Sequence, residues 1–236
     1  MPRTLVIPDI HNRIGFVDDL IRRTKPDEVV FLGDYFDAFD DTPEDAERTA
    51  RWLKARLHLP GYHFLLGNHD ANYRWPKCPW HLTKAYNKNK QDAIDRVLSK
   101  SDWQRMLFAV QRGNWWFTHA GLHPGLFPAH PVLGFREQDV WDKLHDAEFR
   151  CEVAFYTPIT DEQRGPDGIV SGPLWLRWYE FVPIPGVNQV VGHTRYAAPQ
   201  TNHVDGSLNF NIDCDNRYYG ILENDKFETF SVDEHA

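Results

Sequence analysis

Residues 28–37 read EVVFLGDYFD, and this stretch sets the pattern from which the fold is inferred. Its apolar run is typical of a buried strand, and it ends abruptly in a glycine and an aspartate. Two other runs behave in the same way: TLVI at 4–7 leads to Asp9, and YHFLL at 62–66 leads into GNHD. Buried strands that end in polar side chains predict a ligand site at one edge of a sheet.

Segments with helical spacing separate these strands. Phe16 and Leu20 mark the apolar side of a first helix, and Pro43 opens a second helix that Pro60-Gly61 ends. This alternation predicts parallel strands joined by crossover helices. We therefore expect an α/β fold.

The rhythm changes beyond the third strand. The stretch at about 71–112 is interpreted as a mostly helical excursion, with helical patterns near 92–98 and 103–110. Two later strands are predicted at 115–118 and 187–191, and a helix at 138–149. A long polar loop is predicted at 157–172. Three alternating runs then predict an antiparallel meander; they are 208–212, 218–222 and 226–232. No repeat or linker interrupts the chain, so a single domain over 1–236 is expected.

The composition indicates a folded, acidic protein. Of 236 residues, 26 are Lys or Arg and 34 are Asp or Glu, a formal net charge of −8. This balance argues against general coating of nucleic acid, because phosphate neutralisation needs clustered basic side chains. Aromatic residues make up 14% of the chain, which excludes a disordered protein.

The cysteines and the hydropathy of the chain indicate in which cellular compartment the protein is expected. Cys78, Cys151 and Cys214 are odd in number and lack CxxC spacing, which argues against a disulfide framework or a thiolate zinc site. No run of about 18 apolar residues occurs, and the first apolar run is too short for a secretory signal. We expect a cytoplasmic protein with no membrane partner.

Five apolar runs deliver metal-binding residue types to one rim. A single Gly-Asp at a strand end is commonly a turn or a helix cap, but the ordered set is specific. Carboxylate, imidazole and amide donors together suit Mn, Fe or Zn better than an all-oxygen calcium site. The candidates outnumber the ligands of one tetrahedral ion, which predicts two metals roughly 3.5–4 Å apart, suited to phosphoryl displacement.

The residues at the strand ends form five motifs: DIH at 9–11, GDYFD at 33–37, GNHD at 67–70, HAGL at 119–122 and GHT at 192–194. These motifs resemble those of the calcineurin-like metallophosphoesterases. Weaker echoes are WLR at 175–177 and NID at 211–213. The branch most similar holds the Ser/Thr protein phosphatases, their phage and bacterial relatives, and the diadenosine tetraphosphate hydrolases. The resemblance spans nearly the whole chain and implies a sandwich of two mixed β-sheets flanked by α-helices.

The resemblance also implies a ligand set. Asp9 and His11 would hold a first metal ion, and Asp34 would bridge both ions. Asn68, His119 and His193 would hold the second. The cofactors implied are two divalent ions, with Mn favoured and Fe, Zn or Ni as alternatives. A water or hydroxide between them would attack phosphorus directly.

Two further residues take catalytic roles by the same resemblance. His69 stands in the place of the general acid that protonates the leaving oxygen, with Asp37 orienting its ring. Arg177 stands in the place of a phosphate-contacting arginine. An arginine beside Trp175 and Trp178 is as often a stacked structural cation, so both interpretations stay open.

The chain departs from the family pattern near the phosphate site. Ala38 follows Asp37 where most protein-phosphatase-like members carry a phosphate-gripping arginine. Arg13, Arg74 and Arg195 lie near motifs and are candidates for that role, and Arg13 is assigned to substrate binding beside Arg177. Two smaller departures are Asn12 in place of a glycine, and Arg195 in place of the second histidine of GHxH.

The expected function is hydrolysis of a phosphomonoester of the protein-phosphatase-like type. The substrate would be a phosphorylated small molecule, a nucleotide or a phosphoprotein. One alternative is a nucleotide or dinucleoside-polyphosphate hydrolase, for which the aromatic and basic stretch at 75–90 could shape a pocket or pack as a lid. Another is a metal-bound interaction scaffold without catalysis, against which His69 and Asp37 argue. Asp70 is expected only to cap the next helix.

Overall fold

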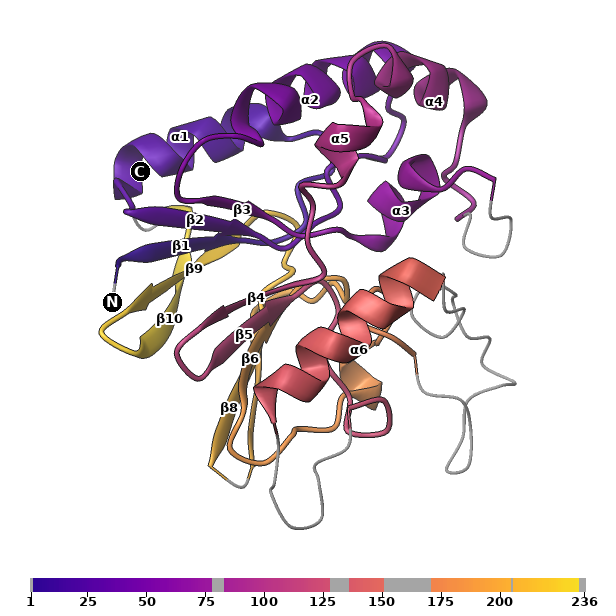
Figure 1. The fold of residues 1–236 in the computed structure, drawn as a ribbon. Coiled ribbons are helices and arrows are strands. Elements are labelled where there is room, and N and C mark those ends of the chain that lie inside the picture. Colours follow the sequence, from indigo (N-terminus) through magenta and orange to yellow (C-terminus); the bar gives the residue numbers. More distant parts are fainter. Residues whose placement is uncertain (1, 78–82, 128–135, 151–170, 205, 234–236) are drawn as a thin grey trace.

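Two five-stranded mixed sheets stack on one another in the computed structural model (Figure 1). The structure describes residues 2–77, 83–127, 136–150, 171–204 and 206–233. The first sheet has the order β10-β9-β1-β2-β3 and the second β4-β5-β6-β8-β7. Helices cover the outer faces of both sheets (Figure 1). The α/β sandwich expected from the motifs is therefore confirmed.

The ten strands divide equally between the sheets. Those of the first sheet are β1 (Thr4–Ile7), β2 (Glu28–Phe31), β3 (Tyr62–Phe64), β9 (Tyr218–Glu223) and β10 (Lys226–Ser231). Those of the second are β4 (Ala109–Arg112), β5 (Trp115–Thr118), β6 (Asn188–Val191), β7 (Gln200–Val204) and β8 (Ser207–Asn211).

The helices fall into three groups. α1 (Ile14–Thr24) and α2 (Pro43–Arg56) lie over the first sheet, and α6 (Glu137–Arg150) lies beside the second (Figure 1). The remaining ones are α3 (Asn68–Arg74), α4 (Lys88–Asp95), α5 (Lys100–Trp103) and the 3-10 turn η3 (Trp178–Glu180). Within the described ranges, no helix has both the length and the apolar character needed to cross a membrane.

The predicted parallel core of the first sheet is confirmed. Val6 lies opposite Val30 in the parallel pair β1–β2, and Val30 lies opposite His63 in the parallel pair β2–β3. Because side chains alternate along a strand, Leu5 and Ile7 pack beneath the helices while Val6 faces the other sheet. All of these apolar side chains are fully buried.

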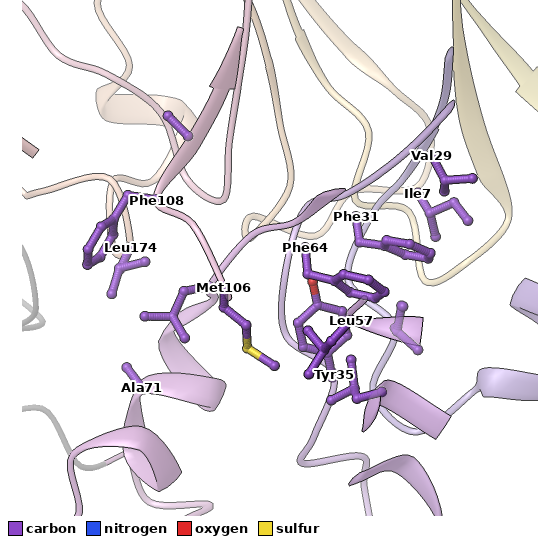
Figure 2. Close-up of a cluster of buried hydrophobic side chains, with 14 of the residues drawn as sticks. Ile7, Val29, Phe31, Tyr35, Leu57, Phe64, Ala71, Met106, Phe108 and Leu174 are labelled. Carbon is purple, nitrogen blue, oxygen red and sulfur yellow. The ribbon is translucent and has the colours of Figure 1, made fainter. Parts of the chain in front are cut away.

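Aromatic stacking joins β2 to β3 under the helices. The rings of Phe31 and Phe64 are stacked with centroids 4.5 Å apart, and Figure 2 shows them side by side near Leu57. Trp52 of α2 meets Phe31 edge-on at 5.7 Å. These contacts fix α2 on the sheet and so fix the loop between β2 and α2 that carries Asp37.

The helical interpretation of the excursion is wrong near its end. The stretch near 103–110 is helical only as far as α5, and β4 is found in place of a continued helix. Ala109 and Val110 pair with Thr118 and Phe117 of β5 in an antiparallel hairpin, and this pairing outweighs the helical spacing. Elsewhere in the described excursion the helices are α3, α4 and α5, with non-helical residues between them.

The predicted meander is also wrong. β9 and β10 form an antiparallel hairpin in the first sheet, but β8 lies in the second, parallel to β6 and antiparallel to β7. Alternating apolar residues report one buried face and do not say which sheet covers it, which explains the error. β7 was not predicted, because this edge strand is largely exposed and its residues show no apolar alternation. Most of the expected loop at 157–172 lies outside the described residues.

Candidate dinuclear metal centre

The strand-end residues converge on one open cleft. Its volume is about 970 Å³, and its walls include predicted metal ligands from several separate motifs. Among the described residues that line it are Asp9, His11, Asp34, Asn68, His69 and His193. His119 lies directly beneath, with no exposed surface. The structure therefore brings all the predicted ligands together.

Tight backbone turns position the side chains of the site. His11, Asp34, Asp37 and His193 all adopt left-handed conformations, with φ of 45°, 51°, 65° and 68°. Such angles are uncommon for residues other than glycine and are typical of functional turns. The amide of His11 donates to the carbonyl of Asp34 at 2.8 Å, so the first two turns support each other.

Two glycines let the turns approach the carboxylates. A Cβ on Gly67 would lie 2.1 Å from Oδ1 of Asp34, and a Cβ on Gly192 would lie 2.2 Å from Oδ1 of Asp9. These distances are far below contact distance, so neither position tolerates a side chain without displacing a predicted ligand. This explains the glycine that opens GNHD and the one that opens GHT.

Asp9, His11 and Asp34 form the first candidate ligand group, with their ligand atoms within 4.8 Å of one another. Nδ1 of His11 contacts the carbonyl oxygen of Phe36 at 2.9 Å. A ring nitrogen facing a carbonyl carries the proton, so Nε2 presents its lone pair to the site. That atom lies 4.0 Å from Oδ2 of Asp34. The group thus offers carboxylate and imidazole donors to one ion.

Asp34, His119 and His193 form the second candidate group, again within 4.8 Å. Nδ1 of His119 faces the carbonyl of Leu32 at 2.9 Å, which leaves Nε2 for the site. Oδ1 of Asn68 lies 2.9 Å from Nε2 of His119 and 3.0 Å from Nδ1 of His193. The lone pair on Nε2 of His119 therefore faces the amide oxygen of Asn68, an arrangement that a bound cation stabilises. Asp34 belongs to both groups, as a bridging ligand must.

The electrostatics of the site are those of a cation pocket. Burial raises the pKa of Asp9 well above its usual value, and the neighbouring Asp213 and Asp34 raise it further. Burial opposes ionisation of Asp34 too, but His119, His69 and His11 outweigh it and lower its pKa to about 2. Burial, with His119 adding to it, lowers the pKa of His193 to about 3. A neutral imidazole is the form that binds metal.

His69 and Asp37 form a pair beside the ligands. Nδ1 of His69 lies 3.0 Å from Oδ2 of Asp37, and the backbone amide of His69 donates to Asp34 at 2.9 Å. Burial disfavours the His69 cation, but Asp34 and Asp37 outweigh that cost and raise its pKa to about 9. With Nδ1 directed at Asp37, the other ring nitrogen is the one available to the cleft.

Asp37 is held by partners that sequence analysis missed. Its Oδ1 accepts from the hydroxyl of Tyr73 at 2.5 Å and from Nζ of Lys90 at 3.0 Å. Asn72 contacts its other oxygen at 3.4 Å. Lys90 is 6% exposed, which is unusual for a lysine. Nothing in the local pattern of α4 distinguishes Lys90 from the exposed lysine two residues before it.

Asp70 does more than cap α3. It accepts the amide of Gly67 at 2.9 Å, as expected of a residue in the first turn. It also accepts the amides of Asp34 and Tyr35, at 2.8 and 2.9 Å. Asp70 therefore ties the turn after β3 to the turn after β2, and so fixes Asp34 relative to Asn68.

Of the four arginines considered for phosphate binding, two line the cleft and two have their contacts elsewhere. Arg177 and Arg195 line the cleft. Arg177 contacts the hydroxyl of Tyr179, with its guanidinium 5.7 Å from that ring. Arg13 instead bonds Asp215, through its carbonyl at 3.0 Å and its carboxylate at 3.1 Å, and is not among the described residues lining the cleft. Arg74 lies over the ring of Trp75.

Other cleft residues were not singled out as ligands or contacts. Asp213 lines the cleft and is buried, and its NID motif was the only signal for it. From the basic stretch at 75–90, Thr83 and Lys84 line the cleft, so part of that stretch does form a wall of the site. Residues 78–82 lie outside the described residues, as do Cys78 and Cys151, whereas Cys214 is buried and free.

Comparison with solved structures supports the fold. A mutant of a cold-active protein tyrosine phosphatase matches with a TM-score of 0.61 at 16% identity, over 98% of this chain and 78% of that one. The cold-active protein tyrosine phosphatase of a psychrophilic Shewanella species gives 0.60 at 13% identity, with the same coverage. A serine/threonine phosphatase from Saccharomyces cerevisiae gives 0.50 at 16% identity, over 98% and 80%.

Sequence comparison identifies the family. No curated protein sequence matches the chain significantly. The family model for calcineurin-like phosphoesterases, however, matches residues 2–217, which include every predicted metal ligand. Together with two ligand groups that share Asp34, this match shows that the chain belongs to the calcineurin-like phosphoesterase family and is a metal-dependent phosphoesterase.

Proposed function

We propose that this phosphoesterase hydrolyses phosphate monoesters in the manner of the protein-phosphatase-like branch. The observation that carries the proposal is the His69–Asp37 pair, with its 3.0 Å contact, at the wall of the cleft that holds the ligand groups. A histidine oriented by a carboxylate beside a phosphate site is suited to protonate a leaving oxygen.

The ligands fit two divalent ions, for which we propose manganese. Asp9, His11 and Asp34 would hold one ion, and Asp34, Asn68, His119 and His193 the other. When bound, the pair would stabilise negative charge on the phosphoryl oxygens and activate the attacking water.

The protein groups then handle the proton and the substrate charge. His69 would give its proton to the leaving oxygen from the ring nitrogen that faces the cleft, while Asp37 keeps the ring in place. Arg177, at the cleft, would bind the non-bridging oxygens, for which a planar guanidinium is well suited. For the role of the missing arginine after Asp37 we favour Arg195 over Arg13. Both contact Asp215, at 3.6 and 3.1 Å, but Arg195 lines the cleft, whereas Arg13 is not among the described residues that do.

Hydrolysis of nucleotides or dinucleoside polyphosphates is the second candidate. It is favoured by three cationic side chains around the cleft, Lys84, Arg177 and Arg195. Trp175 and Tyr179, which also line it, could stack on a base. A non-catalytic scaffold is disfavoured, because it would not need a histidine held by a buried carboxylate.

The first experiment measures turnover and its dependence on His69. Protein loaded with Mn should hydrolyse p-nitrophenyl phosphate and phenyl phosphate. His69→Ala should slow phenyl phosphate hydrolysis by ~10²–10⁴ with both metals retained, since only the proton donor is lost. His58→Ala is the matched control, because His58 is 56% exposed and pairs with Asp102 away from the site.

A substrate panel separates the two candidates. Phosphopeptides, nucleotides and dinucleoside polyphosphates should be compared by kcat/KM under identical metal loading. Preference for the monoesters supports the proposal, whereas a preference for polyphosphates supports the second candidate. Absence of turnover with Mn, Fe and Zn across the whole panel would contradict the proposal that this protein catalyses phosphoester hydrolysis.

A further inference from the structure

We propose that Lys90 is a positioning residue for catalysis, which acts through Asp37 on the ring of His69. The inference rests on the proposed role of His69 as the proton donor. It adds a residue from the excursion, far from every motif in sequence, to the machinery of leaving-group departure.

The geometry places a buried ammonium between two buried carboxylates. The Lys90 side chain is 7% exposed, and its Nζ lies 3.0 Å from Oδ1 of Asp37. The same ammonium contacts Oδ1 of Asp41, whose side chain is 5% exposed. A charge this deeply buried is stable only when it is paired, and here the carboxylates of Asp37 and Asp41 pair with it.

The contacts hold the Asp37 carboxylate from both sides. Oδ2 faces His69, while Oδ1 accepts from Lys90 and from the hydroxyl of Tyr73. Donors on Oδ1 fix the plane of the carboxylate, and this plane sets the direction from which Oδ2 can receive the ring N–H of His69. The orientation of the His69 ring therefore depends on Lys90.

A second set of bonds anchors Lys90 itself. Oδ2 of Asp41 accepts from Nδ2 of Asn12 at 2.8 Å, and Oδ1 of Asn12 accepts from the hydroxyl of Thr49 at 2.7 Å. Asn12 is the residue that replaces the usual glycine beside His11. A series of hydrogen-bonded side chains thus runs from α2 through the first turn to Lys90 of α4. From Lys90 it continues through Asp37 to His69.

Lys90 does not act as a direct substrate contact. It is not among the described residues that line the cleft, and its ammonium points at carboxylates. Loss of Lys90 should therefore disturb proton delivery and leave phosphate binding intact. This separates it from Lys84, which lines the cleft on the same segment.

The test compares leaving groups. In Lys90→Met, kcat for phenyl phosphate and for glycerol phosphate should fall by at least about tenfold, because a poor leaving group needs the proton. For p-nitrophenyl phosphate, whose leaving group departs as an anion, kcat should change by less than about threefold. KM should stay unchanged for all three, and Lys90→Arg should recover most of the lost rate.

Two controls keep the result specific. Lys88→Met changes an exposed lysine of the same helix, paired with Asp92, and should leave every rate unchanged. Adding Lys90→Met to His69→Ala should cause no further loss with phenyl phosphate, since both act on one proton transfer. Metal content and melting temperature should be measured for each variant.

A charge-balanced variant covers the case in which Lys90→Met does not fold. Lys90→Met combined with Asp41→Asn removes one positive and one negative charge, so the buried cluster keeps its net charge. The same dependence on leaving group is expected. Equal losses for all substrates, or no loss, would overturn the inference while wild-type turnover stands. A wild-type protein without turnover would instead overturn the proposed function.

Discussion

Asp9 is a candidate metal ligand whose charge depends on a bound cation. It is fully enclosed, it faces Asp213 and Asp34, and its pKa is raised well above its usual value in the metal-free protein. The backbone amide of His193 donates to it at 3.1 Å, which offsets only part of this effect. Asp9 therefore holds a proton at pH values where an exposed aspartate is ionised.

Metal uptake should release protons. Binding requires the Asp9 carboxylate, so apparent Mn affinity should increase as pH rises from about 4 towards the raised pKa of Asp9. His69 adds release in the same direction, because cations beside it disfavour its charged form, whose metal-free pKa is about 9. Calorimetry in buffers of different ionisation enthalpy measures the proton count.

Asp213→Asn supplies the control for this effect. It removes the carboxylate that raises the pKa of Asp9 most, so fewer protons should be released per metal bound. Proton uptake on binding, or an affinity that falls with pH, would contradict the assignment of Asp9 as a ligand.

Single residues were predictable from sequence where a strand end exposes them. Asp9, Asp34 and His119 each follow an apolar run, so their position at the sheet edge follows from the period of the strand. Lys90 and Tyr73 lie on helices with no such marker, and they reach Asp37 only through tertiary packing. Spacing along the chain holds no information on that contact.

At the level of elements, the turns after the strands are as constrained as the ligands. Gly192→Ala would place a Cβ 2.2 Å from Oδ1 of Asp9, so the carboxylate or the turn must move. We expect loss of at least one metal ion per chain and a large loss of turnover, with secondary structure retained. Metal analysis and circular dichroism on the same sample test this.

Gly15→Ala is the matched substitution. Nothing lies within 4 Å of a Cβ built at Gly15, which is in the first turn of α1. Alanine there should retain full metal content and stabilise the protein by up to about 0.5–1 kcal/mol, because glycine is a poor helix former. Full metal retention in Gly192→Ala would contradict the steric argument.

Helices and strands were predictable from the sequence where their own pattern of apolar residues is enough to identify them. β1, β2 and β3 are short apolar runs between amphipathic helices, and a parallel arrangement follows from that order. β8 and β9 are predicted from sequence as neighbours in one antiparallel meander, yet they lie in different sheets. Which partner a strand takes is decided by the faces that meet across the sandwich, and these are set by residues distant in sequence.

On the scale of the whole molecule, the two sheets share one inner core. Val6 and Val30 of the first sheet belong to the same buried cluster as Phe117 and Val190 of the second. Neither sheet can lose its partner without exposing this surface, at a cost of roughly 25 cal/mol per Å² of apolar area.

A single cooperative unfolding transition is therefore expected, in keeping with our proposal of one domain. Denaturation monitored by far-UV circular dichroism and by tryptophan fluorescence should give coincident curves, since Trp52 reports on the first sheet and Trp115 on the second. Two separated transitions in the metal-free protein would contradict a single domain.

The position of β1 in the first sheet has a consequence for biosynthesis. β1 lies between β2 and β9, so one of its edges pairs with a strand near the start of the chain and the other with a strand near its end. Once β1 to β3 have been synthesised, the nascent chain has an open edge on β1, beside Asp9, until β9 emerges from the ribosome. Open edges invite pairing with other chains. Folding during translation therefore includes an interval in which this edge can pair wrongly. The interval ends only when β9 has been made, after the candidate ligand His193.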